Sequence, residues 1–333
     1  MACGSESPGA REPAPAPEPV GAAQRQLALV PANVQSVAQA DVRRFYDRAA
    51  AREVERLLGM AAAAEMPGGD VGCLFDLLKT VGQATAFVWD PPGGSDQAAV
   101  LLETDAEPAA VGECIERATA GTLCRVPTRA DWADAVAIDD CGAARGDEPE
   151  GVIFVMEEGL LAIAEWRLGQ AMRSRRTGRP IASDPAFRAL SERAGPGDAT
   201  LVVLQREPAR DRGRPVRWSG FAGSVRAGPP VSARAVFVSR DGTDIASVVR
   251  LFEHARGEMI RQIRSMLDVA GLPIEVDRER TGAAMDAVSG ILESVSARGA
   301  GDTVTFEVVL PDSTNAPSLA ADLAYLLAAL LLR

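Results

Sequence analysis

Few side chains in this sequence could carry out acid-base or nucleophilic chemistry. His254 is the single histidine and Lys79 the single lysine, so arginine supplies every other cationic side chain. Arginine stays protonated at working pH and anchors carboxylates or phosphates, but it does not shuttle protons. A zinc motif with two histidines is therefore excluded, and any Ser-His-Asp or Cys-His arrangement would have to use His254.

Two pairs of adjacent acids, Asp139–Asp140 and Glu157–Glu158, could serve a hydrolase as general acid and base. Adjacent acids on loops are more often solvated charges, and His254 is expected at the edge of the apolar face of a helix. The sequence has no phosphate-binding glycine loop, no G-x-S-x-G turn and no aspartate-rich calcium loop. We therefore expect no catalytic residue, no cofactor and no metal, and we keep a carboxylate-dependent hydrolase as the alternative.

The five cysteines fall into two groups. Cys3 stands near the start, in Ala2-Cys3-Gly4-Ser5, and the others lie in one stretch of the first half: Cys73, Cys114, Cys124 and Cys141. An even number favours two disulfides in an oxidising compartment, and the spacing does not choose among the three connectivities. A zinc site is a second interpretation, although no C-x-x-C pair is present, and isolated buried thiols are a third.

One local group of positive charges stands out against the acidic balance of the chain. It comprises Arg167, Arg173, Arg175, Arg176 and Arg179. Cations at the end of a helix complement its dipole and usually stay solvated. The alternative is a patch that binds an anion or a lipid headgroup.

Length and charge set further limits. The chain has 333 residues, a formal net charge of -11 and 47% hydrophobic residues, enough to bury a sizeable core in two domains or in one duplicated domain. Nucleic-acid binding needs a basic face, and this acidic chain with dispersed arginines does not predict one.

The chain begins with a tether, residues 1–26, that is rich in proline and alanine and is expected to be disordered. Ala2-Cys3-Gly4-Ser5 followed by this linker resembles the start of a mature bacterial lipoprotein, which implies that Cys3 carries a lipid anchor. At the other end, the apolar run 323–332 is shorter than the roughly 20 residues of a membrane span and is expected to form a core helix.

The hydrophobic pattern predicts helices and strands in both halves of the chain. Asp41 can cap a helix that runs to Gly59, Leu160 to about Met172 reads as a helix, and Ser183-Asp184-Pro185 opens another. A long helix with a 3.6-residue period is expected over 245–269. Strands are expected at 84–89, 98–102, 123–126, 135–138, 152–156, 200–204, 235–239 and 303–310, with further helices at 109–118, at 283–295 and from 319.

This order of elements favours an α+β fold with antiparallel sheet over a doubly wound nucleotide-binding fold. A strand followed by an aspartate and a helix occurs at Ala99-Val100 with Asp105, and again 136 positions later at Ala235-Val236 with Asp241. The identities are close to chance in an alanine-rich chain, so the repeated order of elements carries the argument. We predict two similar lobes of antiparallel sheet with packed helices, 27–180 and 181–333, preceded by the tether.

The opening Leu29–Ala32, the segment 34–41 and the Gly-Asp-Ala strand start at 197–199 resemble uncharacterised envelope lipoproteins of high-GC bacteria. Asn33 stands where that family usually has an aspartate. The resemblance implies duplicated α+β lobes, a location in the cell envelope and no assigned catalytic residues.

Together these features predict a non-enzymatic, lipid-anchored protein on the periplasmic face of a bacterial membrane. It would bind a protein or small-molecule partner in the groove between its lobes, and would be a monomer that touches the membrane only through its tether. The alternatives are the carboxylate-dependent hydrolase and a cytosolic protein of unknown function with reduced thiols.

Overall fold

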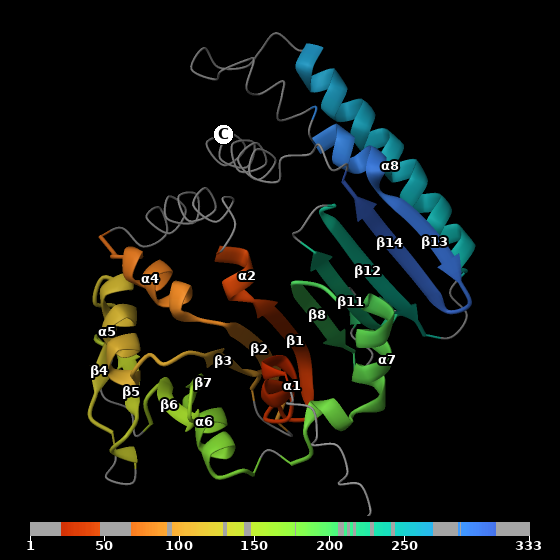
Figure 1. Ribbon diagram of the computed structural model, residues 1–333. Coiled ribbons are helices and arrows are strands. Elements are labelled where there is room, and N and C mark those ends of the chain that lie inside the picture. Colours follow the sequence, from red (N-terminus) through yellow and green to blue (C-terminus); the bar gives the residue numbers. More distant parts are fainter. Residues whose placement is uncertain are drawn as a thin grey trace, which may run out of the picture.

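Figure 1 presents the computed structural model of the protein. The structure describes residues 21–46, 68–91, 95–128, 132–142, 148–176, 178–205, 210–211, 214–215, 218–226, 230–240, 244–268, 286 and 288–310. Cys3, most of the predicted tether, the apolar run 323–332 and the predicted helix from 319 lie outside these residues. Within the described part, no helix is both long enough and apolar enough to cross a membrane.

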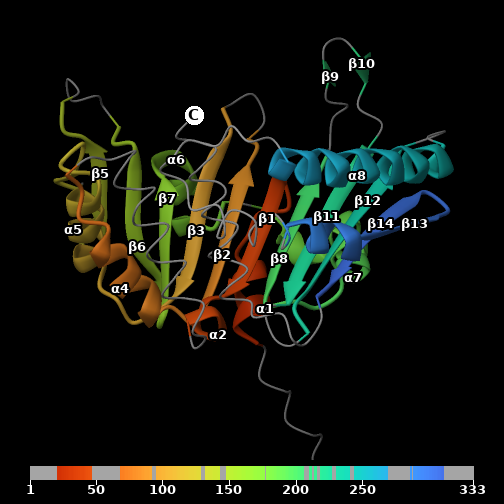
Figure 2. The ribbon, with the colours of Figure 1, turned by 90° about the horizontal axis from the view of Figure 1, so that it is seen from above.

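The described residues form one antiparallel sheet of twelve strands in the order β13-β14-β12-β11-β8-β1-β2-β3-β7-β6-β5-β4 (Figures 1 and 2). Its first-half strands are β1 (Val34–Asp41), β2 (Gln83–Trp89), β3 (Gln97–Glu103), β4 (Leu123–Val126), β5 (Val136–Asp140), β6 (Gly151–Glu157) and β7 (Leu160–Glu165). Its second-half strands are β8 (Ala199–Leu204), β11 (Trp218–Arg226), β12 (Ser232–Ser239), β13 (Ser296–Ala300) and β14 (Thr303–Val309). The strands β9 (Arg210–Asp211) and β10 (Arg214–Pro215) pair separately.

Helices cover both faces of this sheet. On the first face, which we call the α7 face, lie α1 (Ala22–Leu27), α6 (Trp166–Arg173), the short 3₁₀ helix η2 (Ile181–Ser183) and α7 (Pro185–Ala194). On the opposite face lie α2 (Val42–Tyr46), α4 (Gly72–Thr80), α5 (Pro108–Ala118) and α8 (Ile245–Asp268). The α+β class is therefore confirmed.

The strand register explains this layering. Directly paired residues point to the same face, and Phe87, Val37, Val202 and Ala222 are linked by successive pairs across β2, β1, β8 and β11. All four are buried in the cluster that lies under α6 and α7. The residues that alternate with these four along each strand face the other way. On that opposite face Leu102 packs with Val111 of α5 in a second cluster.

The two halves of the chain meet at one pair of neighbouring strands. β1 from the N-terminal half pairs antiparallel with β8 from the second half, from Ser36 opposite Val203 to Ala40 opposite Ala199. We call this pair the β1–β8 seam. The predicted lobes therefore share one continuous sheet, and the division at residue 180 remains a prediction.

Local capping signals explain two helix starts that the sequence predicts. The Asp41 carboxylate accepts a hydrogen bond from the Arg44 backbone N–H at 2.9 Å, at the start of α2. The Asp184 carboxylate accepts from the N–H groups of Ala186 and Phe187 at 2.8 and 3.1 Å, and Pro185 occupies the first turn of α7.

Two expectations were wrong in detail, and two strands were not predicted. Leu160–Glu165 is strand β7, and the helix begins only at Trp166, because Gly159, with φ 72°, turns the chain into a hairpin with β6. Residues 22–26, expected in the tether, belong to α1, where Gln26 is buried. The sequence also gave no indication of β11, in which Gly220 and Gly223 weaken the strand pattern, nor of β13.

Candidate functional site

The four cysteines of the first half form two disulfides at the β4–β5 end of the sheet. Cys73 on α4 bonds to Cys114 on α5, with 5.6 Å between Cα atoms, and Cys124 on β4 bonds to Cys141 after β5, at 5.2 Å. The disulfide prediction is confirmed. The zinc site and the isolated thiols are wrong, because all four of these sulfurs are bonded in pairs. Disulfides persist in oxidising compartments, so these pairs indicate that the protein folds outside the cytoplasm.

The structure spreads the predicted arginine patch over α6 and the loop after it. Arg167 pairs with Glu148 at 3.1 Å. Arg173 pairs with Asp134 at 2.7 Å, and its guanidinium lies 4.6 Å from the ring centroid of Trp132. The remaining members are exposed and form no ion pair within the described part of the chain: Arg175, Arg176 and Arg179. Anion binding by this patch stays a prediction.

The predicted acid pairs do not form a substrate-sized site. Asp139 and Asp140 lie in β5, whereas Glu157 and Glu158 line a hollow of only about 10 Å³ beside Glu103. Such a volume holds about one water molecule. His254 is exposed on α8.

Two carboxyl groups have a lowered pKa, and neither supports the hypothesis of a carboxylate-dependent hydrolase. The pKa of Asp134 lies below its ordinary value because Arg173 donates a hydrogen bond to it. The pKa of Asp244 is lowered by hydrogen bonds from Ser247. A general acid requires the opposite shift.

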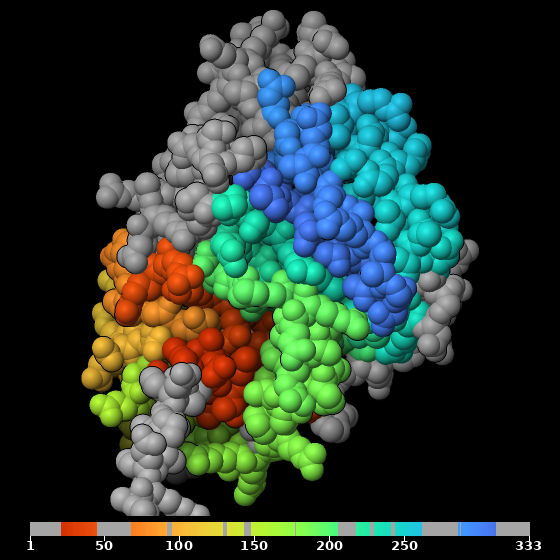
Figure 3. Space-filling view, turned by 45° about the vertical axis from the view of Figure 1, so that its right-hand side comes forward, coloured from red at the N-terminus to blue at the C-terminus, as the bar shows by residue number. Residues whose placement is uncertain are grey.

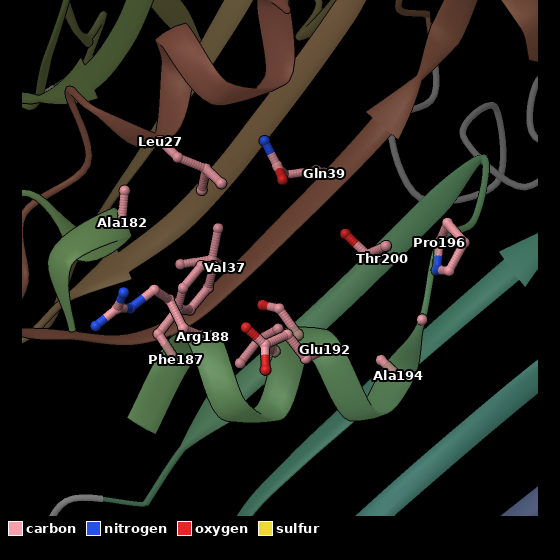
Figure 4. A pocket seen from close by; sticks show the side chains of 13 residues that line it. Leu27, Val37, Gln39, Ala182, Phe187, Arg188, Glu192, Ala194, Pro196 and Thr200 are labelled. Carbon is pink, nitrogen blue, oxygen red and sulfur yellow. The ribbon is translucent and has the colours of Figure 1, made fainter. Parts of the chain in front are cut away.

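A groove of about 490 Å³ lies over the β1–β8 seam on the α7 face. In the space-filling view the N-terminal segment, red, and α7, green, lie side by side (Figure 3). Its floor comes from β1 and β8, one wall from the end of α1 and the other from α7 (Figure 4). Both halves of the chain therefore build this site.

The groove has an apolar floor and polar residues at its edges. Apolar side chains come from Leu27, Val37, Ala182, Phe187, Ala194 and Val202. Polar and charged side chains come from Gln39, Arg188, Ser191, Glu192 and Thr200. Gly195 and Pro196 line the end of the groove where α7 turns into β8. Small-molecule sites commonly combine this apolar lining with a few polar groups and have volumes of about 300–1,000 Å³.

A hydrogen-bond network fixes the orientation of Gln39. The buried Gln26 amide donates to the Gln83 carbonyl, and its oxygen accepts from the Thr85 hydroxyl. The Gln39 amide nitrogen donates to the Ala23 carbonyl and to the Thr85 hydroxyl oxygen, each at 3.0 Å. Both amide protons of Gln39 are thus used, while its carbonyl oxygen has no donor among the described residues. Gln39 presents an acceptor to the groove.

Two opposite charges on α7 border the groove. Arg188 and Glu192 are exposed, one helical turn apart, and neither forms an ion pair with any described residue. Figure 4 shows the Arg188 side chain extending toward Ala182, away from Glu192. Arg188 precedes Glu192 along the helix, and an ion pair between residues four apart is less favourable when the basic residue comes first.

Several contacts hold α7 in place as the groove wall. Phe187 and Leu190 are buried against the sheet, and the Leu190 side chain fills the space above Gly220, where a Cβ atom would lie 2.5 Å from it. The Ser224 hydroxyl donates to the Ala194 carbonyl at 2.7 Å. Gly195, with φ 74°, then ends the helix in a conformation that other residues rarely adopt.

A row of polar side chains crosses the sheet beneath the end of α7. Successive strand pairs align Thr85, Gln39, Thr200, Ser224, Arg234 and Glu307. Gln39 and Thr200 line the groove, whereas Ser224 and Arg234 line a second hollow, of about 260 Å³, on the other side of the α7–β8 loop. In that hollow Arg234 lies 3.6 Å from Glu307.

The sequence predicted a groove between two lobes but none of its residues. Only the start of α7 and the strand 200–204 were predicted locally. Gln39 gave no distinctive signal, because Asp41 is also polar on the face of β1 that Gln39 shares with Val37.

Comparisons with known proteins do not assign this chain to a family. No family model matches it, and no curated protein matches it. One solved structure, titled "Structure of crystal form I of TP0453", aligns with 90% of this chain and 96% of its own chain, at 7% identity and a TM-score of 0.43.

Proposed function

We propose that this protein is a lipid-anchored binding protein of the bacterial cell envelope, and that it holds a small ligand with an apolar body in the groove over the β1–β8 seam. The observation that carries the proposal is the groove itself, about 490 Å³ in volume with an apolar floor and polar edges.

The envelope location is supported by three independent features. The two disulfides require an oxidising compartment. The segment Ala2–Ser5 and the linker after it resemble the start of a mature bacterial lipoprotein, and the opening Leu29–Ala32 resembles that of envelope lipoproteins of high-GC bacteria. Together they favour Cys3 as the lipid-bearing residue and a membrane-attached protein.

Binding in the groove can be tested with an uncharged apolar dye, N-phenylnaphthylamine, whose fluorescence rises in apolar surroundings. Ser191 lines the groove, and its side chain makes no hydrogen bond within the described residues, so Ser191→Trp fills the groove without removing a contact. We expect saturable binding by the unmodified protein and a loss of affinity of about tenfold or more in Ser191→Trp.

The matched control is Ala189→Trp, on the same helix but exposed and outside the groove lining. It should bind the dye as the unmodified protein does. Equal binding by all three proteins would place the dye elsewhere and contradict the groove as the binding site.

The anchor can be tested by metabolic labelling with a fatty-acid analogue, with the chain expressed behind a lipoprotein leader. The unmodified protein should be labelled and should fractionate with membranes, and Cys3→Ser should abolish both. Undiminished labelling of Cys3→Ser would refute the anchor and leave the dye result standing.

A further inference from the structure

We infer that the ligand of the groove is a zwitterionic apolar molecule of the size of a short peptide, with its carboxylate at Arg188 and its ammonium group at Glu192 and Gln39. This inference rests on the proposed function, because it names the ligand class of the same groove.

Two side chains of the groove, Gln39 and Glu192, offer only hydrogen-bond acceptors to a ligand. Gln39 has only its carbonyl oxygen available, because both of its amide protons are bound to Ala23 and Thr85. Glu192 is likewise only an acceptor, and the Thr200 hydroxyl can donate or accept. A ligand at this end gains most from N–H groups, and most of all from an ammonium group.

The opposite charge lies at the other end of the α7 wall. The Cα atoms of Arg188 and Glu192 are separated by four residues, which is about 6 Å along a helix axis. The two termini of an extended dipeptide are about 7 Å apart. Arg188 also extends toward Ala182, which lengthens the distance between the two charged groups (Figure 4). A dipeptide or tripeptide spans this arrangement.

The floor requires that the ligand also be apolar. Val37 and Val202 lie in the floor of the groove and Phe187 on its α7 wall, and all three are buried side chains of the main core cluster. Burying apolar side chains on such a floor releases about 25 cal/mol per Å² of covered surface. A polar zwitterion such as diglycine covers little of it.

The same groups disfavour a simple fatty acid. Its alkyl chain would fit the floor and its carboxylate would pair with Arg188, but it would bring no donor to Gln39. Glu192 would also repel its carboxylate. The two ligand classes therefore predict different responses to the same substitutions.

The experiment is displacement of bound N-phenylnaphthylamine from the full chain by L-leucyl-L-valine, by its N-acetyl derivative and by its C-terminal amide. Each charged group of the free dipeptide meets one exposed partner, so masking either terminus should weaken binding about fivefold. Diglycine should not displace the dye.

Two variants assign the termini. Arg188→Gln should weaken the free dipeptide about fivefold and leave the affinity of the C-terminal amide unchanged. Glu192→Gln should weaken the free dipeptide and leave the affinity of the N-acetyl form unchanged. Arg117→Gln and Glu113→Gln, exposed residues of α5 on the opposite face, are the matched controls and should change neither.

The outcomes separate this inference from the proposed function. If the dye binds in the groove but the dipeptide does not displace it, or if decanoate displaces it better than the dipeptide, the ligand class is wrong and the binding site stands. If masked and free dipeptides bind equally, the charge assignment is wrong. Absence of groove-specific dye binding refutes the proposed function itself.

Discussion

At the scale of the residue, Asn33 uses both the oxygen and the nitrogen of its carboxamide group. Asn33 accepts a hydrogen bond from the Trp89 indole N–H at 2.7 Å and donates one to the Asp90 carbonyl at 3.1 Å. These bonds tie the turn before β1 to the end of β2. An ionised aspartate at this position could not make the second bond.

Asn33→Asp should therefore lower the free energy of unfolding at neutral pH by about 1–2 kcal/mol, because the Asp90 carbonyl loses its donor and meets a negative charge. Urea denaturation at several pH values checks this. Below about pH 4 the carboxyl is protonated and can donate again, so the deficit relative to the unmodified protein should shrink. A deficit independent of pH would mean that another contact is responsible.

Arg173 and Asp134 form a second residue-scale contact, beside the ring of Trp132. The Arg173 guanidinium holds the pKa of Asp134 below its ordinary value of 3.8. A group whose pKa is lower in the folded state stabilises the fold above its unfolded pKa, and this contribution is lost as the pH falls through the folded value.

We expect Asp134→Asn to lower stability at pH 7 by less than about 1 kcal/mol, since the pair is largely exposed. The difference from the unmodified protein should vanish in acid, below the ordinary carboxyl range. Thermal or urea unfolding between neutral and acid pH measures it. Asp139→Asn is the control, and an equal pH response in that variant would count against the Arg173 contact as the cause.

At the scale of the element, the sequence predicted what local signals determine. Asp184 and Pro185 specify the start of α7 through capping alone, and the helix forms where expected. The segment from Leu160 to about Met172 was predicted as one helix, but long-range pairing with β3 and β6 makes Leu160–Glu165 a strand. Gln39 and Glu192 line the same groove only because β1 pairs with β8. No local sequence pattern could predict that pairing.

The disulfides each join two neighbouring elements at one end of the sheet. Cys73–Cys114 joins α4 to α5 with a sequence separation of 41, and Cys124–Cys141 closes the β4–β5 hairpin with a separation of 17. Replacing either pair by serines should cost about 2–4 kcal/mol, and the longer loop should cost about 1 kcal/mol more. Denaturation of the two double variants tests the order. The reverse order would indicate that helix contacts compensate for the lost crosslink.

At the scale of the whole molecule, the described strands of both halves share one sheet and one main core cluster. That cluster includes Phe154 and Trp166 from the first half and Val202 and Ala222 from the second. The two halves are therefore expected to unfold together, although the sequence suggested two lobes.

Val236 is fully buried in the second-half strand β12, and Val236→Ala should lower the free energy of unfolding by about 2 kcal/mol. Three tryptophans, Trp89, Trp132 and Trp166, lie in the first half. If the sheet unfolds as one unit, the fluorescence transition in urea should shift to lower concentration in this variant and remain single. If the halves instead unfold independently, only the component from Trp218 in β11 should shift, and the component from the three first-half tryptophans should stay where it is.

The seam also imposes an order in time on the newly made chain. β1 is complete once Asp41 has been added, but its partner β8 cannot exist before Ala199–Leu204 have been added. At about 5–20 residues per second, synthesis alone separates the two events by roughly 8–30 seconds. During that interval β2 can occupy one edge of β1 while the other edge stays open, and an open strand edge recruits other chains. We therefore expect the nascent protein to depend on a chaperone that shields this edge until the second half arrives.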